Sequence, residues 1–403
     1  MMTPDLGNPS TYLSGFPYDA VAELRRTTPV AWIEEPPSES FPGGPGFWLL
    51  TRHADVITAG KSPEVFSSYA GGTWLRDVPA QELEIQRQAM LNIDPPMHTQ
   101  MRKIINKAFT PRVVDGMAES IARHADDLVA SLDDGGEIDW VDRVSAEMPL
   151  LVLADVLGIP SGERRLLFDW TNRMVGFDDP DAVDKTSYVS AFGELFAYAR
   201  SKTAEKRANP TGDVWSLVVN AEVDGVALND GQLDRFFQLL VVAGNETTRN
   251  MLNGAIVLLS ENPDQWRLLR DDPGLMPKAI EEILRMYPPI FQFRRTCVQD
   301  IELGGQLIKA GDKVVLCYAA ANRDESVFEE PDNFDVTRKN NPHLSFGFGT
   351  HFCLGNGVAR LEVRTLLTKL FERFPKIEVT GEPVRLRSNF VNGITQLPVR
   401  LSA

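Results

Sequence analysis

One stretch near the middle of the chain is long enough to cross a whole protein as a single helix. It begins after Asn229 and Asp230, which are good N-cap residues, and it continues from residue 232 to about residue 260, stopping before Pro263. At 1.5 Å per residue such a helix is roughly 45 Å long. The fold must therefore accommodate one element that spans the molecule.

The remainder of the chain is also dominated by helical periodicity. Apolar residues recur at three- and four-residue steps in the stretches 20–24, 104–109, 117–132, 148–157 and 192–204. Short β-rich runs occur at 30–33, 47–50, 301–308, 313–316 and around 379–401. We therefore predict a mainly α protein with small β-sheets gathered at one side.

Length and composition limit the classes to which the chain can belong. Its 403 residues would suggest two or three domains from length alone, yet no repeat, low-complexity tract or Gly/Ser linker divides it, so we expect one domain over 1–403. With 41 Lys+Arg against 56 Asp+Glu, the net charge of -15 argues against a nucleic-acid partner, because a phosphate backbone requires a basic surface.

Neither a membrane span nor a secretory signal is expected. The best apolar stretch, residues 148–159, is interrupted by Asp155 and is shorter than the roughly 20 residues that a bilayer requires. The N-terminus has no basic region followed by an apolar core. Three scattered cysteines are too few for a disulfide framework and suit a reducing compartment. We expect a cytoplasmic protein in which one cysteine is kept for chemistry.

The strongest chemical signal is the glycine-rich segment from Phe346 to Gly355, which contains Cys353. Its glycines permit a tight loop whose N–H groups point at the sulfur, as a thiolate ligand of haem iron requires. The loop then enters a helix N-terminus, which favours an anionic sulfur and predicts a lowered pKa for the thiol. The alternative, a buried inert cysteine beside a glycine turn, would be preferred for an isolated cysteine.

This segment resembles the haem-binding loop of the cytochrome P450 superfamily, Phe-Gly-x-Gly-x-His-x-Cys-x-Gly, and it fills every defined position. The resemblance extends from about residue 18 to 401 and is to the soluble bacterial type. It implies the P450 fold, a helical body with a long central helix and a β-rich side. It also implies haem b as the cofactor, with Cys353 as the axial iron ligand. Gly349 would let the loop reach the haem face. The other positions that the resemblance assigns to cofactor binding here are Phe346, Gly347, His351 and Gly355 in the loop, with Ala243 and Gly244 of the long helix.

A second signal lies in the long helix, where Ala243 and Gly244 precede Glu246 and Thr247. Glycine costs about 1 kcal/mol in a helix interior, so helicity alone does not select this sequence. An acid beside a hydroxyl can relay protons to dioxygen, and the two small residues predict a local bulge where oxygen can sit over the iron. The alternative is a solvent-facing Glu beside a helix-bending Thr. The resemblance favours the relay.

A third pair, Glu282 and Arg285, lies at i and i+3 on a helix predicted from about 277 to 287. Such spacing usually marks a surface ion pair of little energetic value. In the P450 family, Glu-x-x-Arg instead forms a buried structural triad with an arginine of a downstream segment, which Arg338 matches here. We assign the three residues a role in folding rather than in catalysis.

The propionates of a haem require cationic or hydrogen-bonding partners. Asp94 and Pro95 predict the N-cap and first position of a helix that places two candidates one turn apart. By resemblance, the propionate ligands are His98, Arg102, Arg295 and His343, with His351 as a weaker fifth candidate.

The substrate pocket is less well defined by the sequence. By resemblance it draws on the segment 69–90, the region 174–177, and Leu240, Val241, Ala243, Ile290, Phe291, Phe293, Phe390 and Val391. This lining is largely apolar and predicts a small hydrophobic substrate. The stretches 243–250, 322–328 and 387–393 resemble bacterial P450s that hydroxylate terpene alcohols such as linalool or terpineol, and those that oxidise the cholesterol side chain. They favour a terpenoid or steroid oxidised at an allylic or terminal carbon.

Electrons must reach the haem from another protein, because no flavin or nicotinamide fingerprint is present. By resemblance the donor is a ferredoxin supplied by an NAD(P)H-dependent reductase, with O2 as co-substrate. Arg102, Lys103, Lys107, Arg112, Arg360 and Arg364 could form its basic docking patch.

Several alternatives to a terpenoid or steroid monooxygenase remain at this stage. A fatty-acid or alkane hydroxylase shares part of the pattern. A peroxygenase of the same superfamily, or a haem sensor or carrier without turnover, would not need Glu246 and Thr247. An inert helical scaffold would require all four motifs to be coincidental.

Overall fold

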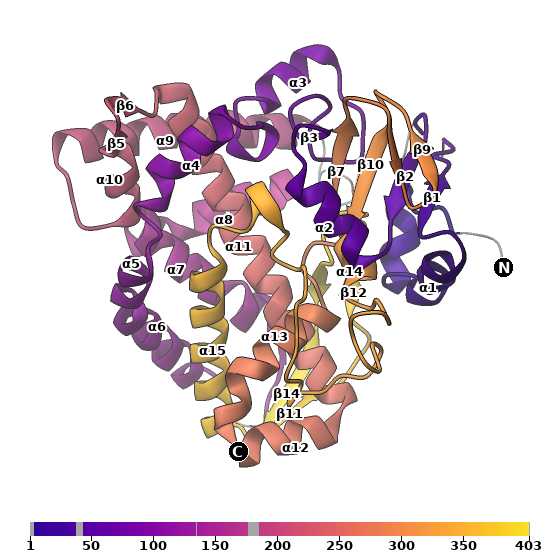
Figure 1. The fold of residues 1–403 in the computed structure, drawn as a ribbon. Helices are drawn as coiled ribbons and strands as arrows, with labels where there is room; N and C mark the ends of the chain where they lie inside the picture. The colour runs from indigo at the N-terminus through magenta and orange to yellow at the C-terminus, as the bar shows by residue number, and fades with distance from the viewer. Residues whose placement is uncertain (1–3, 38–42, 134, 176–184, 403) are drawn as a thin grey trace.

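The computed structural model describes residues 4–37, 43–133, 135–175 and 185–402. Helices make up most of the body, and the strands of the largest sheet lie together on one side of it (Figure 1). The prediction of a mainly α protein with small β-sheets is therefore confirmed. The helices are α1 (Tyr18–Thr27), α2 (His53–Lys61), α3 (Ala80–Gln86), α4 (Met97–Asn106), α5 (Pro111–Gly116), α6 (Ala118–Ala130), α7 (Glu147–Leu157), α8 (Arg164–Val175), α9 (Lys185–Ala208), α10 (Val214–Val219), α11 (Asp230–Glu261), α12 (Pro263–Asp271), α13 (Met276–Met286), α14 (Tyr318–Ala321) and α15 (Asn356–Arg373).

The largest sheet has the strand order β1-β2-β10-β7-β3, formed by Val30–Ile33, Phe47–Leu50, Lys313–Cys317, Gln292–Cys297 and Phe66–Ser67. Only the β2–β10 pair in this sheet is parallel. The sequence predicted three of these strands but neither β7 nor β3. The smaller sheets are β11-β14-β4 (Lys376–Val379, Pro398–Ser402, Glu137–Asp139), β12-β13 (Val384–Arg385, Ile394–Gln396), β5-β6 (Glu222–Val223, Val226–Ala227) and β8-β9 (Ile301–Leu303, Gln306–Ile308).

The predicted long helix is α11, which runs from Asp230 to Glu261 and so extends slightly beyond the expected bounds at both ends. Its start is fixed by a capping box, in which the side chains of Asn229 and Gln232 each bond the backbone N–H of the other. Helices α7, α8, α9, α13 and α15 all contact it, so it lies at the centre of the helical body (Figure 1).

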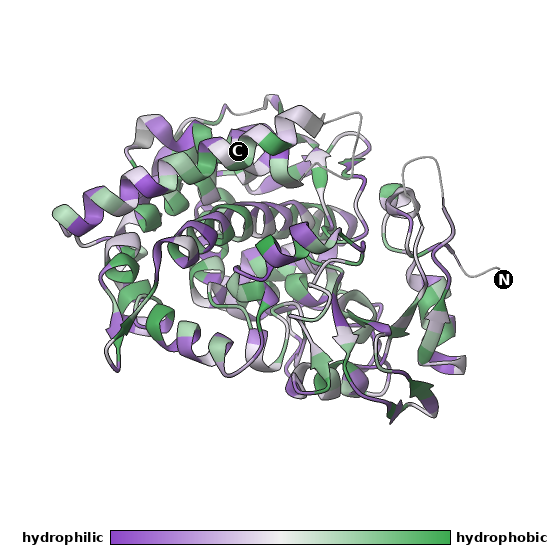
Figure 2. Cartoon of the chain, turned by 90° about the horizontal axis from the view of Figure 1, so that it is seen from above, coloured by the Kyte–Doolittle hydropathy of each residue, from purple (hydrophilic) through white to green (hydrophobic). Residues whose placement is uncertain are grey.

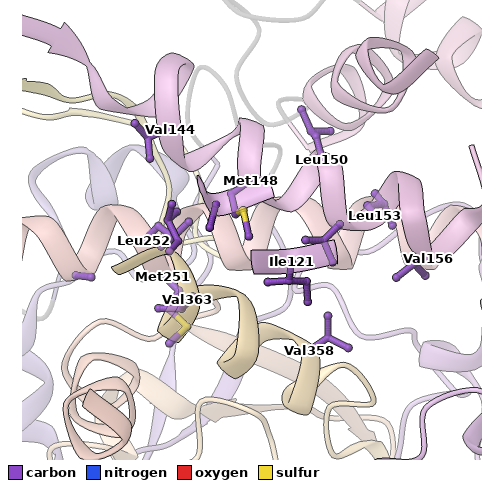
Figure 3. Packing of buried hydrophobic residues seen from close by; sticks show 14 of the residues in the cluster. Ile121, Val144, Met148, Leu150, Leu153, Val156, Met251, Leu252, Val358 and Val363 are labelled. Atoms are coloured by element: carbon purple, nitrogen blue, oxygen red, sulfur yellow. The ribbon is translucent and has the colours of Figure 1, made fainter. Parts of the chain in front are cut away.

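The main hydrophobic core fills the space between α6, α7, α11 and α15. In Figure 3, Met148 of α7 points toward Leu252 of α11, and Val363 of α15 lies close to Met251. Burying each such side chain contributes about 1.5–3 kcal/mol to folding. This packing fixes α11 relative to α15, and these two helices carry the two halves of the candidate site.

The outer helices carry hydrophilic and hydrophobic residues in alternation along their length, which is the pattern of helices with one buried face (Figure 2). Within the described ranges, no helix combines the length and the apolar character that crossing a bilayer would require.

Candidate functional site

Cys353 lies in a tight loop between a short 3-10 turn, Gly349–His351, and the start of α15 at Asn356. Its backbone N–H donates to the carbonyl of Phe346 at 2.9 Å, and the Asn356 side chain donates to its carbonyl at 2.8 Å. These bonds close the loop on both sides of the cysteine.

Two loop glycines have conformations that other residues rarely adopt. Gly347 and Gly349 have φ angles of 71° and 74°, in the left-handed region. A Cβ at Gly349 would also overlap the carbonyl oxygen of Gly60 at the end of α2. The sequence pattern therefore has a physical cause, because a side chain at Gly349 would push the loop away from α2.

The thiol of Cys353 differs from the sequence-based expectation. We expected the helix N-terminus to lower its pKa, but burial raises it. The backbone amides of Gly355 and Asn356 and the guanidinium groups of Arg102 and Arg360 act in the opposite direction without outweighing burial. A metal ion bound at the sulfur would favour the thiolate, because it displaces the proton.

Beside the loop, Glu281 of α13 collects three hydrogen bonds. Arg360 of α15 donates two to it, at 2.6 and 2.8 Å, while its guanidinium lies 4.4 Å from the ring centroid of Phe346. His343 is 3.0 Å from the same carboxylate. Burial raises the pKa of Glu281, but these hydrogen bonds outweigh it and bring the pKa to about 2. In this structure His343 contacts Glu281. The role of His343 as a propionate ligand stays a prediction.

The other four propionate candidates converge from three elements: His98 and Arg102 from α4, Arg295 from β7 and His351 from the cysteine loop. The rings of His98 and His351 lie 4.3 Å apart. Within the described part of the chain, neither ring nitrogen of the buried His98 has a hydrogen-bond partner. Orphaned polar atoms of this kind indicate an absent ligand.

The charge of this cluster is unbalanced. Burial, with help from Arg102, lowers the pKa of His98 to about 4, and burial also lowers the pKa of His351, so both rings are neutral near pH 7. Arg102 and Arg295 therefore leave two positive charges, each desolvated enough to lower its pKa. Two cations and two imidazoles match the two carboxylates of a haem, so the residues present fit this cofactor.

Asp94 is the acid nearest to this cluster, and it was expected to cap α4. Instead, α4 begins at Met97 without a side-chain cap. The Asp94 carboxylate accepts hydrogen bonds from the hydroxyl of Ser67 and the backbone N–H groups of Ser68 and Tyr69. Both carboxylate oxygens of Asp94 accept hydrogen bonds from the loop that follows β3. The Asp94 side chain therefore stabilises that loop rather than the start of α4.

On α11, the hydroxyl of Thr247 donates to the carbonyl of Ala243 at 2.6 Å. Glu246 is buried, 3.0 Å from Arg249, and accepts a hydrogen bond from Asn250 at 2.9 Å. The predicted bulge is not present, because α11 continues as regular helix through this segment. Gly244 faces α7, where an added Cβ would lie 3.4 Å from a methyl group of Leu153, which is an ordinary van der Waals contact. Packing against α7 therefore does not require a glycine at this position.

A cavity of about 580 Å³ adjoins this part of α11. Five of the predicted pocket residues line it, namely Ala243, Ile290, Phe293, Phe390 and Val391, and so do both proposed relay residues, Glu246 and Thr247. Met174 of the predicted 174–177 region lines it as well, whereas Phe177 lies outside the described residues.

Three predicted pocket residues do not line the cavity. Leu240 and Val241 of α11 pack into the main core instead. Phe291 packs against Tyr12 and Phe16 near the N-terminus. The helical period explains Val241, because positions three or four residues apart share a face and Val241 is only two residues from Ala243. It does not explain Leu240, which is three residues from Ala243.

Sequence reasoning missed several residues of the lining. Helical steps back from Ala243 would have found Leu239 and Arg235, which do line the cavity. No local pattern marked the contributions of α9, since its residues Tyr188, Phe192 and Phe196 meet α11 only in the folded chain.

Glu282, Arg285 and Arg338 form one buried group. Arg285 donates to both oxygens of Glu282, at 2.8 and 2.7 Å, and Arg338 donates to the same carboxylate at 3.0 Å. Neither Glu282 nor Arg285 has exposed surface. Further bonds from Arg285 to the carbonyls of Asn322 and Asn333 tie α13 to the segment that leads into the cysteine loop.

Comparison with known proteins agrees with this geometry. Residues 168–401 match the family model described as Cytochrome P450. A steroid C26-monooxygenase of Mycolicibacterium smegmatis is 36% identical, covering 98% of this chain and 94% of the relative. A linalool 8-monooxygenase of Pseudomonas putida is 40% identical, covering 100% and 99%. A Mycobacterium marinum cytochrome P450 solved in complex with pseudoionone superposes with a TM-score of 0.91 at 36% identity, covering 99% of each chain.

Proposed function

The chain belongs to the cytochrome P450 family, and on that premise we propose that it hydroxylates a terpenoid or steroid at a terminal or allylic carbon. It is a P450 monooxygenase, and members of the family use haem with a cysteine thiolate as axial ligand. The single observation that carries the substrate proposal is the 580 Å³ cavity, which is lined mainly by aliphatic and aromatic side chains and includes Ala243 and Thr247 in its lining.

We assign the axial ligand to Cys353 and the propionate contacts to His98, Arg102, Arg295 and His351. When bound, haem with a thiolate ligand activates O2, because the thiolate supplies electron density that favours O–O cleavage. Cys297 and Cys317 are poor candidates for this ligand, since both are buried within the strands of the main sheet.

Glu246 and Thr247 are assigned to proton delivery. Thr247 holds a proton on Oγ1, which can turn from the Ala243 carbonyl toward the cavity. Glu246 also lines the cavity, and its contacts with Arg249 and Asn250 orient its carboxylate. An acid and a hydroxyl at adjacent positions allow a proton to pass through a site that otherwise excludes water.

Two named relatives support the choice of substrate. One is named for oxidation of a steroid at C26 and the other for oxidation of linalool at position 8. The aromatic pair Phe293 and Phe390, whose ring centroids are 5.1 Å apart in an edge-to-face arrangement, gives the cavity an apolar aromatic wall that either skeleton can contact.

Reconstituted turnover tests this proposal. The haem-loaded protein, supplied with NADPH, ferredoxin and ferredoxin reductase, should convert at least one member of a panel of linalool, terpineol, cholest-4-en-3-one and dodecanoic acid. We expect hydroxylated products from the terpenoids or the steroid, located by mass spectrometry. If only dodecanoic acid were converted, the proposal would be wrong and the protein would be a fatty-acid hydroxylase.

We further propose that a ferredoxin docks on the side of the cysteine loop. A hollow of about 360 Å³ lies there, bordered by Leu354, Arg360 and Arg364. Arg112, at the start of α5, belongs to the same basic patch in our proposal. Reversing both charges, Arg112→Glu with Arg364→Glu, should slow reduction by ferredoxin but leave chemical reduction by dithionite unchanged. If ferredoxin reduced the double variant as fast as the wild type, this docking site would be wrong.

We also propose a cytoplasmic location. Its support is that Cys297, Cys317 and Cys353 are all free thiols, as a reducing compartment maintains them. Thiol counting in freshly lysed cells, with fractionation of a tagged chain, tests this assignment.

A further inference from the structure

Arg235 of α11 lines the apolar cavity, although most of its neighbours there are hydrocarbon side chains. Its guanidinium lies 4.5 Å from the ring centroid of Phe196. One of its nitrogens donates to Oε1 of Gln238, one turn further along the helix, at 3.1 Å. The other N–H groups of this planar fork remain available to a ligand in the cavity.

The other charged groups of the lining already have opposite partners. Arg76 lies 3.9 Å from Glu82, and Glu246 pairs with Arg249. Asp234, the acid next to Arg235 in sequence, is instead bound to Arg200 at 2.8 Å. In the part of the chain that the structure describes, no carboxylate lies within ion-pair distance of Arg235. Burial lowers the pKa of its guanidinium, and the charge of Asp234 opposes this effect without outweighing it.

Arg235 is also placed at a fixed distance from the position where oxidation would occur. It precedes Ala243 by eight residues on α11, which corresponds to about 12 Å along the helix axis. Both residues line the same cavity, with Leu239 between them. An apolar molecule held at Arg235 by one end would therefore extend along α11 toward Ala243 and Thr247.

We propose that Arg235 and Gln238 bind the carboxylate of an apolar substrate, so that the end remote from the carboxylate is the one oxidised. The inference rests on the proposed function and narrows it to terpenoid or steroid carboxylic acids. A guanidinium binds a carboxylate through two parallel hydrogen bonds, and the neighbouring amide of Gln238 adds a third donor once it turns. Arg235 and Gln238 thus act as specificity residues and take no part in the chemistry.

Matched ligands test this proposal on the haem-loaded protein. Farnesoic acid and its methyl ester share one skeleton and differ in charge at one end, and binding of each is followed by the shift of the haem absorption band. We expect the acid to bind at least roughly tenfold more tightly than the ester. Arg235→Gln should lower the affinity for the acid by roughly tenfold to a hundredfold, which is the loss expected for a charge-assisted pair. The affinity for the ester should be nearly unchanged.

Further variants separate recognition of the carboxylate from a general effect on the protein. Arg207→Gln removes a positive charge at the exposed end of α9, outside the cavity, and should leave both affinities unchanged. Arg235→Lys keeps the charge but not the planar fork, and should recover part of the preference for the acid. Gln238→Leu, which leaves the guanidinium in place, should reduce the preference less than Arg235→Gln.

Two results would overturn the proposal: equal binding of acid and ester to the wild type, or equal weakening of both by Arg235→Gln. The site of oxidation gives an independent readout, because the wild type should oxidise the far end of the acid and Arg235→Gln should yield a mixture of positions. A different result would show that the proposed function is wrong, namely that no terpenoid or steroid is turned over. The carboxylate site would still be supported in that case if the wild type preferred dodecanoic acid to its methyl ester and Arg235→Gln lost this preference.

Discussion

The hydroxyl of Thr247 and the carbonyl of Ala243, one turn apart on α11, are joined by a 2.6 Å hydrogen bond. A threonine that bonds back to the preceding turn adds a second donor to a carbonyl already used by the helix. Here the bond holds the Thr247 hydroxyl at the wall of the cavity, beside the residue that we take to be nearest the site of oxidation.

Loss of this hydroxyl should separate electron consumption from product formation. In Thr247→Ala, NADPH oxidation should continue while the yield of hydroxylated product falls, by roughly tenfold or more given the usual contribution of a positioned proton donor. The missing electrons should appear as hydrogen peroxide. Measuring NADPH, peroxide and product in the same reaction checks this balance.

Thr247→Ser is the matched control, because it keeps the oxygen and its bond to Ala243 while removing only a methyl group. We expect it to retain most of the coupling. Unchanged coupling in Thr247→Ala would show that this hydroxyl carries no proton in the reaction.

Arg295 should be required for retention of haem. It is buried on β7, and its one side-chain hydrogen bond to the described residues goes to the carbonyl of Arg294. Removing Arg295 takes away one of the two charges available to the propionates. Arg295→Leu should therefore lose haem more readily, with an affinity roughly tenfold to a hundredfold lower. The rate of haem transfer to excess apomyoglobin measures this effect.

Lys103→Gln provides the comparison, since it removes a positive charge from the exposed face of α4. Its rate of haem transfer should match the wild type. If Arg295→Leu also matched the wild type, the buried cluster would not be the propionate site.

Glu282 should be essential for stability rather than for catalysis. Its carboxylate neutralises two arginines where neither it nor Arg285 reaches solvent. Glu282→Gln leaves Arg285 as an uncompensated buried charge, which costs about 3–5 kcal/mol of unfolding free energy. Urea unfolding, or yield where the variant does not accumulate, measures the loss. Glu119→Gln breaks an exposed pair with Arg123 and should stay within about 0.5 kcal/mol of the wild type.

The features that could be predicted from the sequence are those whose cause is local. The start of α11 follows from Asn229, which caps it, and its end follows from Pro263, two residues beyond Glu261. The cysteine loop follows from Gly347 and Gly349, whose positive φ angles only glycine adopts readily. The pairing of Glu282 with Arg285 lies within one helical turn.

The features that could not be predicted depend on tertiary packing. The thiol pKa of Cys353 is set by how deeply the folded chain encloses it, which a motif does not record. Asp94 looks like a helix cap in sequence, but folding brings it to Ser67 and Ser68. Arg235 was overlooked because its neighbour in the cavity, Phe196, comes from a different helix.

The ion-pair group around Glu281 should make stability depend on pH in the acid range. The pKa of Glu281 falls from 4.5 to about 2, because the bonds from Arg360 and His343 outweigh the effect of burial. A carboxyl with a lowered folded-state pKa stabilises the protein above its unfolded pKa, and it loses that contribution as pH falls from about 4.5 to about 2. Because the side chain is partly exposed, we expect these bonds to add on the order of 2 kcal/mol to the free energy of unfolding at neutral pH.

Glu281→Gln should be less stable than wild type by that amount near pH 7, and the difference should shrink steadily below about pH 4.5. Urea unfolding of both proteins at stepped pH measures it, and a difference independent of pH would mean that the bonds from Arg360 and His343 do not hold the carboxyl in its charged form.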